Sequence, residues 1–387
     1  MAFSPDGTRL SVNQRGGPVQ WWDTNSHRMD QTVDERPYPV QSLAFTPRGE
    51  TLIAGTKISD LGKIRTNLSL GGVSLGVNDR TPCNTIGDFV RFWCMASGQP
   101  RQVLSEMPTL ANQPLTAVSP DGRTLATGAD DGSVSLWDLE SGKRRACLFV
   151  SRHSRTYLPL VVEPSLALGT ALLPQFDGDR VRAVTFSSDG RLFAAAGEDG
   201  QVQLWEASSG KEWASLPGEH AVVSCLAFSP DGKLLATNNG KEIELWDVSA
   251  SDGNPVLSRT LHGHTATVRS IAFTADGRWL AGGAENWDIR LWDSSNGAEV
   301  RQMQGHIGRV SSLAFHPDGK TLASASWDGT VRLWNVATSR ELMILQRAAS
   351  LVHAVAFSPD GTILVAGGER TNGRGEVWFW RELLPSK

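Results

Sequence analysis

Short stretches of alternating apolar and polar residues, separated by turn sequences, recur along the whole chain. Residues 310–345 show this pattern clearly. A first apolar stretch ends at the sequence HPDG, residues 316–319, where proline removes a backbone donor and glycine tolerates positive φ. A small-residue stretch at 321–326, the hairpin signal Asp328-Gly329, alternating residues from 331 and a last stretch at 341–345 follow. The pattern predicts four short antiparallel strands.

This four-strand unit repeats eight times. Each copy opens with an aromatic or apolar residue before Ser-Pro-Asp-Gly or a close variant, and each carries a tryptophan further on. The openings are Phe3, Phe45, Val118, Phe186, Phe228, Phe273, Phe315 and Phe357, and the tryptophans are Trp22, Trp93, Trp137, Trp205, Trp246, Trp292, Trp334 and Trp380. Units of about forty residues cannot bury their own apolar faces and must stack on one another. We therefore predict an all-β, eight-bladed β-propeller of four-stranded blades, in one domain over residues 1–387, with a seven-bladed ring as the alternative.

The string AFHPDGKTLASASWDGTVRLWN, residues 314–335, resembles the WD-repeat propeller family, and its copies extend the resemblance from Phe3 to Trp380. The near-regular repeats are similar to those of bacterial members. In this family, a buried network joins a His before the first strand, a Ser or Thr on the second, the turn Asp and the Trp of the third. The resemblance implies that His306, Ser324, Asp328 and Trp334 form this network. It implies a fold firmly and a particular activity only weakly.

The network is incomplete in other units. The sixth keeps His264 and Trp292 but has Asn286 in the turn and Gly282 at the hydroxyl position. The third keeps Thr127, Asp131 and Trp137 without a His, and the fourth keeps only Asp199 and Trp205. A hydrolase triad of His, Ser and Asp is the alternative interpretation of the complete set. We favour the structural one, because the serine lies on an interior strand and no nucleophile elbow is nearby.

Breaks in the spacing locate two insertions. The interval from opening residue to tryptophan is 18 or 19 residues in six units but 48 in the second, which indicates an insertion at about 57–87. The interval from the third tryptophan to the next opening is 49 instead of the usual 23, which indicates an insertion at about 150–179. The eighth unit has a four-residue extension that contains Arg370 and Arg374. In an antiparallel meander these three segments lie at one end of the ring, which we call the upper rim.

The same reasoning places further side chains at the upper rim. Trp287 and Trp327 fall in turns between second and third strands, and Arg269 and Arg309 lie at the starts of first strands. Loops held by a rigid scaffold are where binding concentrates. We predict that Trp327, Arg309, Arg269, Trp287, Arg370 and Arg374 bind a partner, with ordinary surface residues as the alternative. Arginine suits carboxylates, so an acidic or extended peptide is the expected ligand.

Composition narrows the function further. A net charge of −4 and a pI near 6.1 argue against general nucleic-acid binding. The start of the chain lacks signal-peptide features, and no apolar run approaches the roughly 20 residues of a membrane span. Cys83, Cys94, Cys147 and Cys225 form no close pair and no metal-ligand spacing, so we expect unpaired, buried cysteines in a reducing compartment, with a disulfide as the alternative. We predict a cytoplasmic monomer that binds no nucleic acid or membrane.

The leading functional hypothesis is a non-catalytic protein–protein interaction scaffold that presents a rim of loops to peptide or protein partners. Only Met1-Ala2 precedes Phe3, so the first strand is very short. This observation supports the alternative of a C-terminal sensor part of a truncated or split signalling enzyme, such as a serine/threonine kinase. An eight-bladed quinoprotein-type dehydrogenase is a third hypothesis. The sequence lacks an export signal, a metal site, a cofactor cradle and a Gly-rich phosphate loop, so we predict no enzyme activity, cofactor or metal.

Overall fold

The computed structural model describes residues 2–13, 19–24, 26, 28–34, 40–45, 51–56, 89–94, 100–104, 115–129, 132–150, 180–216, 221–250, 253–347, 351–369 and 375–381. Within these ranges all regular structure is β-strand, and every strand pair is antiparallel. The predicted insertions at 57–87 and 150–179 lie outside the described residues, apart from Val150 at the edge of the second. Arg370 and Arg374 also lie outside them.

The described strands form eight sheets, seven with four strands and one with three. Each sheet is a meander of strands consecutive in the chain. The first four sheets contain β1 (Ala2–Phe3), β2 (Arg9–Asn13), β3 (Val19–Asp23) and β4 (Arg28–Asp34); β5 (Val40–Phe45), β6 (Thr51–Thr56), β7 (Phe89–Cys94) and β8 (Pro100–Leu104); β9 (Leu115–Val118), β10 (Thr124–Gly128), β11 (Ser133–Asp138) and β12 (Arg144–Phe149); β13 (Val181–Phe186), β14 (Leu192–Gly197), β15 (Val202–Glu206) and β16 (Glu212–Leu216).

The other four sheets follow the same order along the chain. They contain β17 (Leu226–Phe228), β18 (Leu234–Asn239), β19 (Glu242–Asp247) and β20 (Val256–Leu261); β21 (Val268–Phe273), β22 (Trp279–Ala284), β23 (Ile289–Asp293) and β24 (Glu299–Met303); β25 (Val310–Phe315), β26 (Thr321–Ser326), β27 (Thr330–Asn335) and β28 (Glu341–Arg347); β29 (Leu351–Phe357), β30 (Ile363–Glu369) and β31 (Gly375–Arg381). These sheets correspond in order to the repeat units of the sequence.

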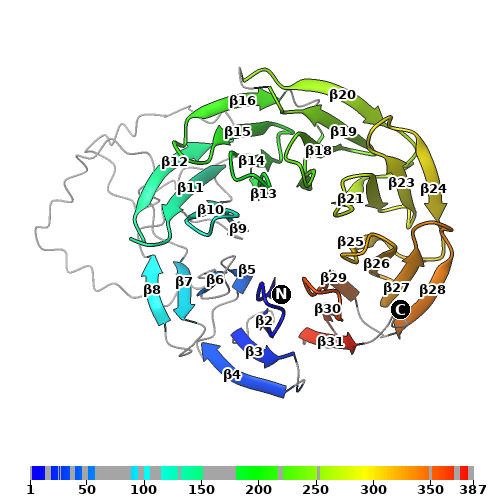
Figure 1. The fold of residues 1–387 in the computed structure, drawn as a ribbon, viewed down its shortest axis with the longest axis horizontal. Coiled ribbons are helices and arrows are strands. Elements are labelled where there is room, and N and C mark those ends of the chain that lie inside the picture. The colour runs from blue at the N-terminus through cyan, green and yellow to red at the C-terminus, as the bar shows by residue number, and fades with distance from the viewer. Residues whose placement is uncertain are drawn as a thin grey trace, which may run out of the picture.

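The sheets stand side by side around a central space, with first strands innermost and fourth strands on the outer edge (Figure 1). The all-β propeller prediction is therefore confirmed. Neighbouring first strands are joined by serine side chains. The Ser270 hydroxyl of β21 accepts a hydrogen bond from Leu313 N of β25 at 3.0 Å, and the Ser312 hydroxyl accepts one from Val355 N of β29 at 3.3 Å. These bonds fix adjacent sheets against each other at the channel wall.

The core lies between the sheets. Second strands are rich in small residues because they are covered on both faces, and all six residues of β14 and of β26 are buried. The third-strand tryptophans Trp137, Trp292 and Trp334 are among the largest fully buried side chains. Trp334 packs with Ile289 and Leu291 of the preceding sheet, so each tryptophan fills the space between two blades.

The turns between first and second strands form the lower rim, at the end opposite the upper rim. In the seventh sheet, His316 lies beside Asp318 in this turn. In six other described turns a Ser or Thr hydroxyl bonds an aspartate two residues on, as Ser119 bonds Asp121 at 2.6 Å. The same aspartate accepts the backbone N–H of Arg123 at 3.0 Å. These hydrogen bonds, with that from Ser119 the strongest influence, lower the pKa of Asp121 from its ordinary value. The SPDG sequence thus encodes a self-bonded turn.

The ring closes between the first and last sheets. Leu10 and Val12 of β2 are buried against Ile363 and Val365 of β30. The Trp22 ring lies 5.6 Å from that of Phe379 on β31. The first strand is as short as the sequence indicates: β1 pairs with β2 through Ala2 and Phe3 alone. Closure therefore depends on apolar packing of second and third strands.

The cysteines differ from expectation in one position. Cys225 is a free thiol, and burial raises its pKa to about 12, so the thiol is chemically inert. Cys147 on β12 is instead disulfide-bonded. The expectation of unpaired cysteines is wrong for Cys147, because which cysteines meet depends on the tertiary structure, and spacing along the chain does not show this.

Candidate partner-binding face

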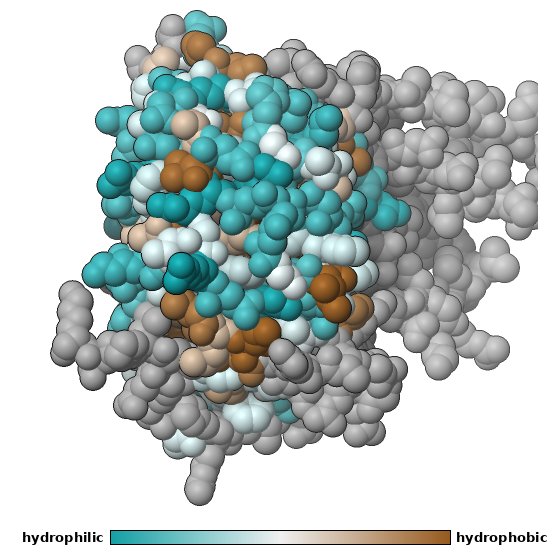
Figure 2. Space-filling model, turned by 90° about the vertical axis from the view of Figure 1, so that its right-hand side faces the viewer, coloured by the Kyte–Doolittle hydropathy of each residue, from teal (hydrophilic) through white to brown (hydrophobic). Residues whose placement is uncertain are grey.

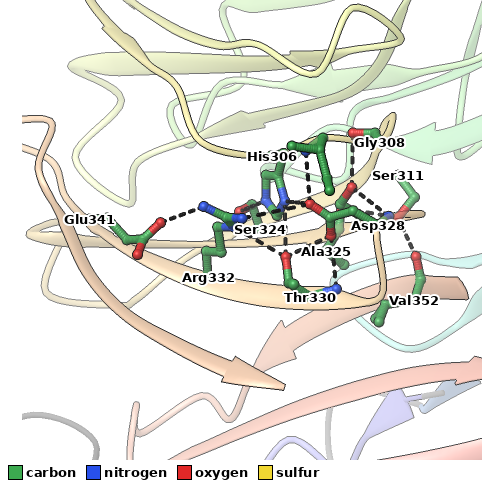
Figure 3. A network of polar contacts seen from close by, with 12 residues as sticks. His306, Gly308, Ser311, Ser324, Ala325, Asp328, Thr330, Arg332, Glu341 and Val352 are labelled. Carbon is green, nitrogen blue, oxygen red and sulfur yellow. Dashed lines mark hydrogen bonds and ion pairs between the residues drawn. The ribbon is translucent and has the colours of Figure 1, made fainter. Parts of the chain in front are cut away.

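The seventh unit contains the complete polar network, and Figure 3 shows the part around His306, Ser324 and Asp328. His306 lies before β25, and its Nδ1 is 2.8 Å from Asp328 Oδ2 in the β26–β27 turn. Its Nε2 is 2.7 Å from the Ser324 hydroxyl on β26. Trp334 on β27 donates its indole N–H to the same hydroxyl at 2.8 Å. The network therefore joins two strands, the turn between them and the loop before β25.

Asp328 is the centre of this network. It accepts hydrogen bonds from Ile307 N at 3.0 Å, Thr330 N at 2.8 Å and the Thr330 hydroxyl at 2.6 Å. Burial works to raise the pKa of Asp328, but the bonds from His306 and Thr330 outweigh it and hold the pKa well below its ordinary value. Arg332 approaches Asp328 at 3.8 Å and bonds Glu341 at 2.6 Å. The lowered pKa favours the charged carboxylate, and its oxygens accept hydrogen bonds from His306, Ile307 and Thr330.

Asp328, His306 and Ser324 are linked in the same order as the carboxylate, histidine and serine of a hydrolase triad. The Ser324 side chain, however, is fully buried, and its hydroxyl already contacts His306 and Trp334. A nucleophile must reach a substrate carbonyl, and this oxygen has no path to one. The geometry supports a structural role for the network.

In the sixth unit, the equivalent histidine and tryptophan contact backbone carbonyl oxygens instead of a serine hydroxyl. His264 Nε2 lies 3.1 Å from the carbonyl oxygen of Gly282, which replaces the serine hydroxyl. Trp292 donates to the carbonyl of His262 at 3.3 Å. Asn286 in the turn donates to Asp288 at 3.1 Å, and its buried Oδ1 and the Nδ1 of His264 have no hydrogen-bond partner. This network is only half satisfied.

Other units retain single bonds of the set. In the third, Trp137 donates to the Thr127 hydroxyl at 3.1 Å, while Asp131 lies outside the described residues. In the fourth, Asp199 accepts the backbone N–H of Gln201 at 3.0 Å. In the fifth, Trp246 donates its indole N–H to the Glu244 carboxylate at 3.2 Å. The polar network is therefore most complete in the seventh unit.

At the upper rim, four side chains from neighbouring sheets form a connected cluster. Arg269 of β21 donates through Nε and Nη2 to Glu285 Oε1, at 2.9 and 2.6 Å. Arg309, just before β25, lies 3.8 Å from the same carboxylate oxygen and stacks over the Trp327 ring. Two guanidinium groups thus share one carboxylate, which leaves one positive charge uncompensated within the cluster.

The pKa of Arg309 reflects its closeness to the second arginine. Partial burial and the neighbouring Arg269 charge lower the pKa of Arg309, against the opposing effect of Glu285. The Trp327 ring also meets the His353 ring of β29, with centroids 5.9 Å apart and ring planes at 89°. Trp327 is half-buried, and its ring contacts two basic side chains.

The structure brings together Arg269, Arg309 and Trp327 and leaves Trp287 apart as an exposed side chain on the same rim. Sequence reasoning missed Glu285, the carboxylate that links both arginines, and Ile307, whose side chain is 75% exposed. Glu285 could have been found from the fourth unit, where Glu198 pairs with Arg182 at the same two positions. No group of three metal-ligating side chains occurs among the described residues.

Radially arranged antiparallel sheets with this buried network define a β-propeller scaffold. The family model "WD domain, G-beta repeat" (WD40) matches residues 105–138, 171–206, 210–247, 255–293, 297–335 and 340–378. These segments make up more than half of the chain, which therefore belongs to the WD40 family.

Curated relatives match over shorter segments. The chain is 35% identical over 102 residues to a target of rapamycin complex subunit, wat1, of Schizosaccharomyces pombe, over 26% of this chain and 32% of that protein. It is 31% identical over 109 residues to the target of rapamycin complex subunit LST8 of Rattus norvegicus, over 28% and 33%. It is 27% identical over 241 residues to periodic tryptophan protein 2 of Arabidopsis thaliana, over 55% and 26%. The matches thus span a third or less of these relatives' own lengths.

A solved structure agrees over the whole chain. The crystal structure of the computationally designed Ika8 protein superposes with a TM-score of 0.70 at 20% identity, over 98% of this chain and 95% of that one. At this identity the likeness concerns the fold alone. No helix in the described part of the chain is long and apolar enough to cross a membrane.

Proposed function

We propose that this WD-repeat protein is a non-catalytic interaction scaffold that holds a protein or peptide partner against its upper rim. The observation that carries the proposal is the cluster of Arg269, Glu285, Arg309 and Trp327, which joins turns of two sheets at one end of the ring. Its side chains are already ordered by one another, so binding requires little loss of side-chain entropy.

The buried polar network of the seventh unit holds in place the loop that carries Arg309. Ile307 N, two residues before Arg309, donates to Asp328. A Cβ on Gly308 would lie 2.6 Å from Asp328 N, so only glycine lets the loop approach the turn this closely. The polar network thus positions the loop that carries Arg309. The relatives named as target of rapamycin complex subunits belong to multiprotein assemblies, which is consistent with a scaffold.

The test is affinity capture with the purified chain and quantitative mass spectrometry. We expect Arg309→Glu and Trp327→Ala to lose the same set of captured proteins at least fivefold. Lys320→Glu, an exposed charge reversal in the lower-rim turn, is the matched control and should retain them. Retention by both upper-rim variants with loss by Lys320→Glu would place binding on the opposite rim and overturn the proposal.

A further inference from the structure

The β22–β23 turn places a tryptophan where equivalent turns of other sheets place glycine. Trp287 has a φ of 72°, and Gly132, Gly200 and Gly329 occupy the same turn position with φ of 77°, 77° and 81°. In this left-handed region, the Cβ of an L-residue crowds its own backbone. A tryptophan here is therefore strained, and strained residues concentrate at functional sites.

The fold does not require the indole ring at this position. The Trp287 side chain is 49% exposed, and within the described part of the chain its ring makes no hydrogen bond, ring stacking or cation–π contact. The bond that closes the turn runs from its backbone N–H to the Ala284 carbonyl at 3.2 Å, and any residue with an N–H would make it. Trp327 on the next sheet differs, because Arg309 and His353 hold its ring.

The neighbourhood supplies a second feature for recognition. Glu285 in the same turn connects to Arg309, so this turn and the loop before β25 share one surface. That loop also carries Ile307, which is 75% exposed. The turn that carries Trp287 and the loop that carries Ile307 are thus both linked, through Glu285 and Arg309, to an arginine pair that retains a positive charge beyond Glu285.

Other exposed apolar residues do not have this combination. Val256, Leu257, Val300, Leu342 and Met343 lie on the outer strands β20, β24 and β28, and Val222 lies in the segment before β17. On the side of the molecule shown in Figure 2, hydrophobic patches stand apart on a mostly hydrophilic surface. Apolar side chains scattered in this way are ordinary on soluble proteins.

We propose that Trp287 is the anchor of the upper-rim site, and that the bound segment carries a large apolar side chain next to a carboxylate. This proposal rests on the proposed function. The apolar side chain contacts Trp287, since an exposed indole offers a large rigid contact area. The carboxylate meets Arg309 and Arg269, whose fork-shaped donors match its two oxygens. A basic segment meets like charge at the same place.

The first test separates binding from packing through stability. Trp287→Gly and Trp287→Ala both remove the ring, but only glycine relieves the left-handed backbone. We expect Trp287→Gly to melt no lower than the unmodified protein, and Trp287→Ala to melt about 1–3 °C below Trp287→Gly, the reverse of the usual order of these residues. A Tm for Trp287→Gly more than about 3 °C below that of the unmodified protein would show a packing role and overturn the inference.

The second test measures binding with defined peptides. Random dodecamers displayed on phage are selected on the intact chain and counter-selected on Arg309→Glu, and an enriched sequence is synthesised as the probe. We expect Asp or Glu beside a large apolar residue, and a Kd at least tenfold weaker for both Trp287 variants. Leu342→Ala, an exposed apolar control on β28, should change the Kd less than twofold.

The outcomes distinguish the two proposals. Enriched peptides that depend on Arg309 but bind the Trp287 variants equally well would overturn the anchor role and leave the proposed function standing. Enriched peptides rich in Lys or Arg would overturn the assigned partner chemistry. Failure to enrich any Arg309-dependent peptide would count against the proposed function itself.

Discussion

His306 and His264 occupy the same position in neighbouring sheets, yet their surroundings differ. His306 contacts Asp328 and Ser324, whereas His264 contacts the carbonyl of Gly282 and leaves Nδ1 unpartnered. The difference follows from three replacements: Gly282 stands in place of Ser324, Asn286 in place of the turn aspartate and Asp288 in place of Thr330. The sixth unit thus has its carboxylate two residues later than the seventh.

Restoring the turn aspartate alone should not repair the sixth unit. Asn286 donates to Asp288 at 3.1 Å, so Asn286→Asp would put two carboxylates side by side. We expect a loss of about 1–2 kcal/mol in unfolding free energy at neutral pH, measured by urea denaturation. The double variant Asn286→Asp with Asp288→Thr recreates the seventh unit's pair and should recover most of that loss. A single variant as stable as the unmodified chain would show that the turn tolerates both charges.

His264 should also make stability depend on pH. Burial, followed by the nearby Arg290 charge, lowers its pKa from 6.5 to about 4, although Asp288 and Asn286 act in the opposite direction. Between pH 4 and pH 6.5, His264 is therefore protonated in the unfolded chain but neutral in the folded chain. The contribution of neutral His264 to the free energy of unfolding is complete above pH 6.5. It is lost as the pH falls toward 4, by up to roughly 3 kcal/mol. Denaturant titrations at several pH values give the unfolding free energy as a function of pH. Between pH 4 and 6.5 this free energy should change less steeply with pH in His264→Gln than in the unmodified chain. An equal pH dependence in both would refute the lowered pKa of His264.

At the scale of single strands, the second and third strands contribute most of the buried structure. β26 is buried along its whole length, and β27 carries Trp334 against the preceding sheet. First strands connect sheets at the channel through serine hydroxyls, as Ser270 and Ser312 show. β1 is the exception, because it pairs through only two residues.

Hydrogen exchange should reflect these differences. We expect amides of β2 in the first sheet to exchange at least tenfold faster than those of β22 and β26, since a short first strand leaves a weaker ladder. Mass spectrometry of deuterated peptides measures this directly. Equal protection in the first, sixth and seventh sheets would indicate that β1 seals its sheet as well as a full-length strand does.

At the scale of the whole molecule, the ring is held closed by contact between its first and last sheets. Trp22 and Phe379 lie at this junction, with their ring centroids 5.6 Å apart. The residues that meet there are the most distant in sequence, so loop-closure entropy opposes the contact more than it opposes any other junction.

Removing either ring should therefore destabilise the whole propeller. We expect Trp22→Ala and Phe379→Ala each to cost about 2–4 kcal/mol of unfolding free energy, and the double variant to show a coupling of about 0.5–1.5 kcal/mol. Val256→Ala, on the outer edge of β20, serves as the exposed control and should cost less than about 0.5 kcal/mol. Strict additivity would mean that the two rings do not act as one closure contact.

The sequence by itself determined the repeating unit, the all-β propeller class and the complete network of the seventh unit. These features are local or periodic: Ser-Pro-Asp-Gly closes its own turn, as at Ser119 and Asp121, and His306, Ser324, Asp328 and Trp334 stand at the positions that the family resemblance implies. The tertiary structure alone decided that Glu285 links Arg269 to Arg309, that Arg309 covers Trp327 and that Cys147 is disulfide-bonded. It also decided that Trp287 adopts a left-handed backbone. Contacts between blades depend on which side chains the ring brings together, and no spacing along the chain encodes them.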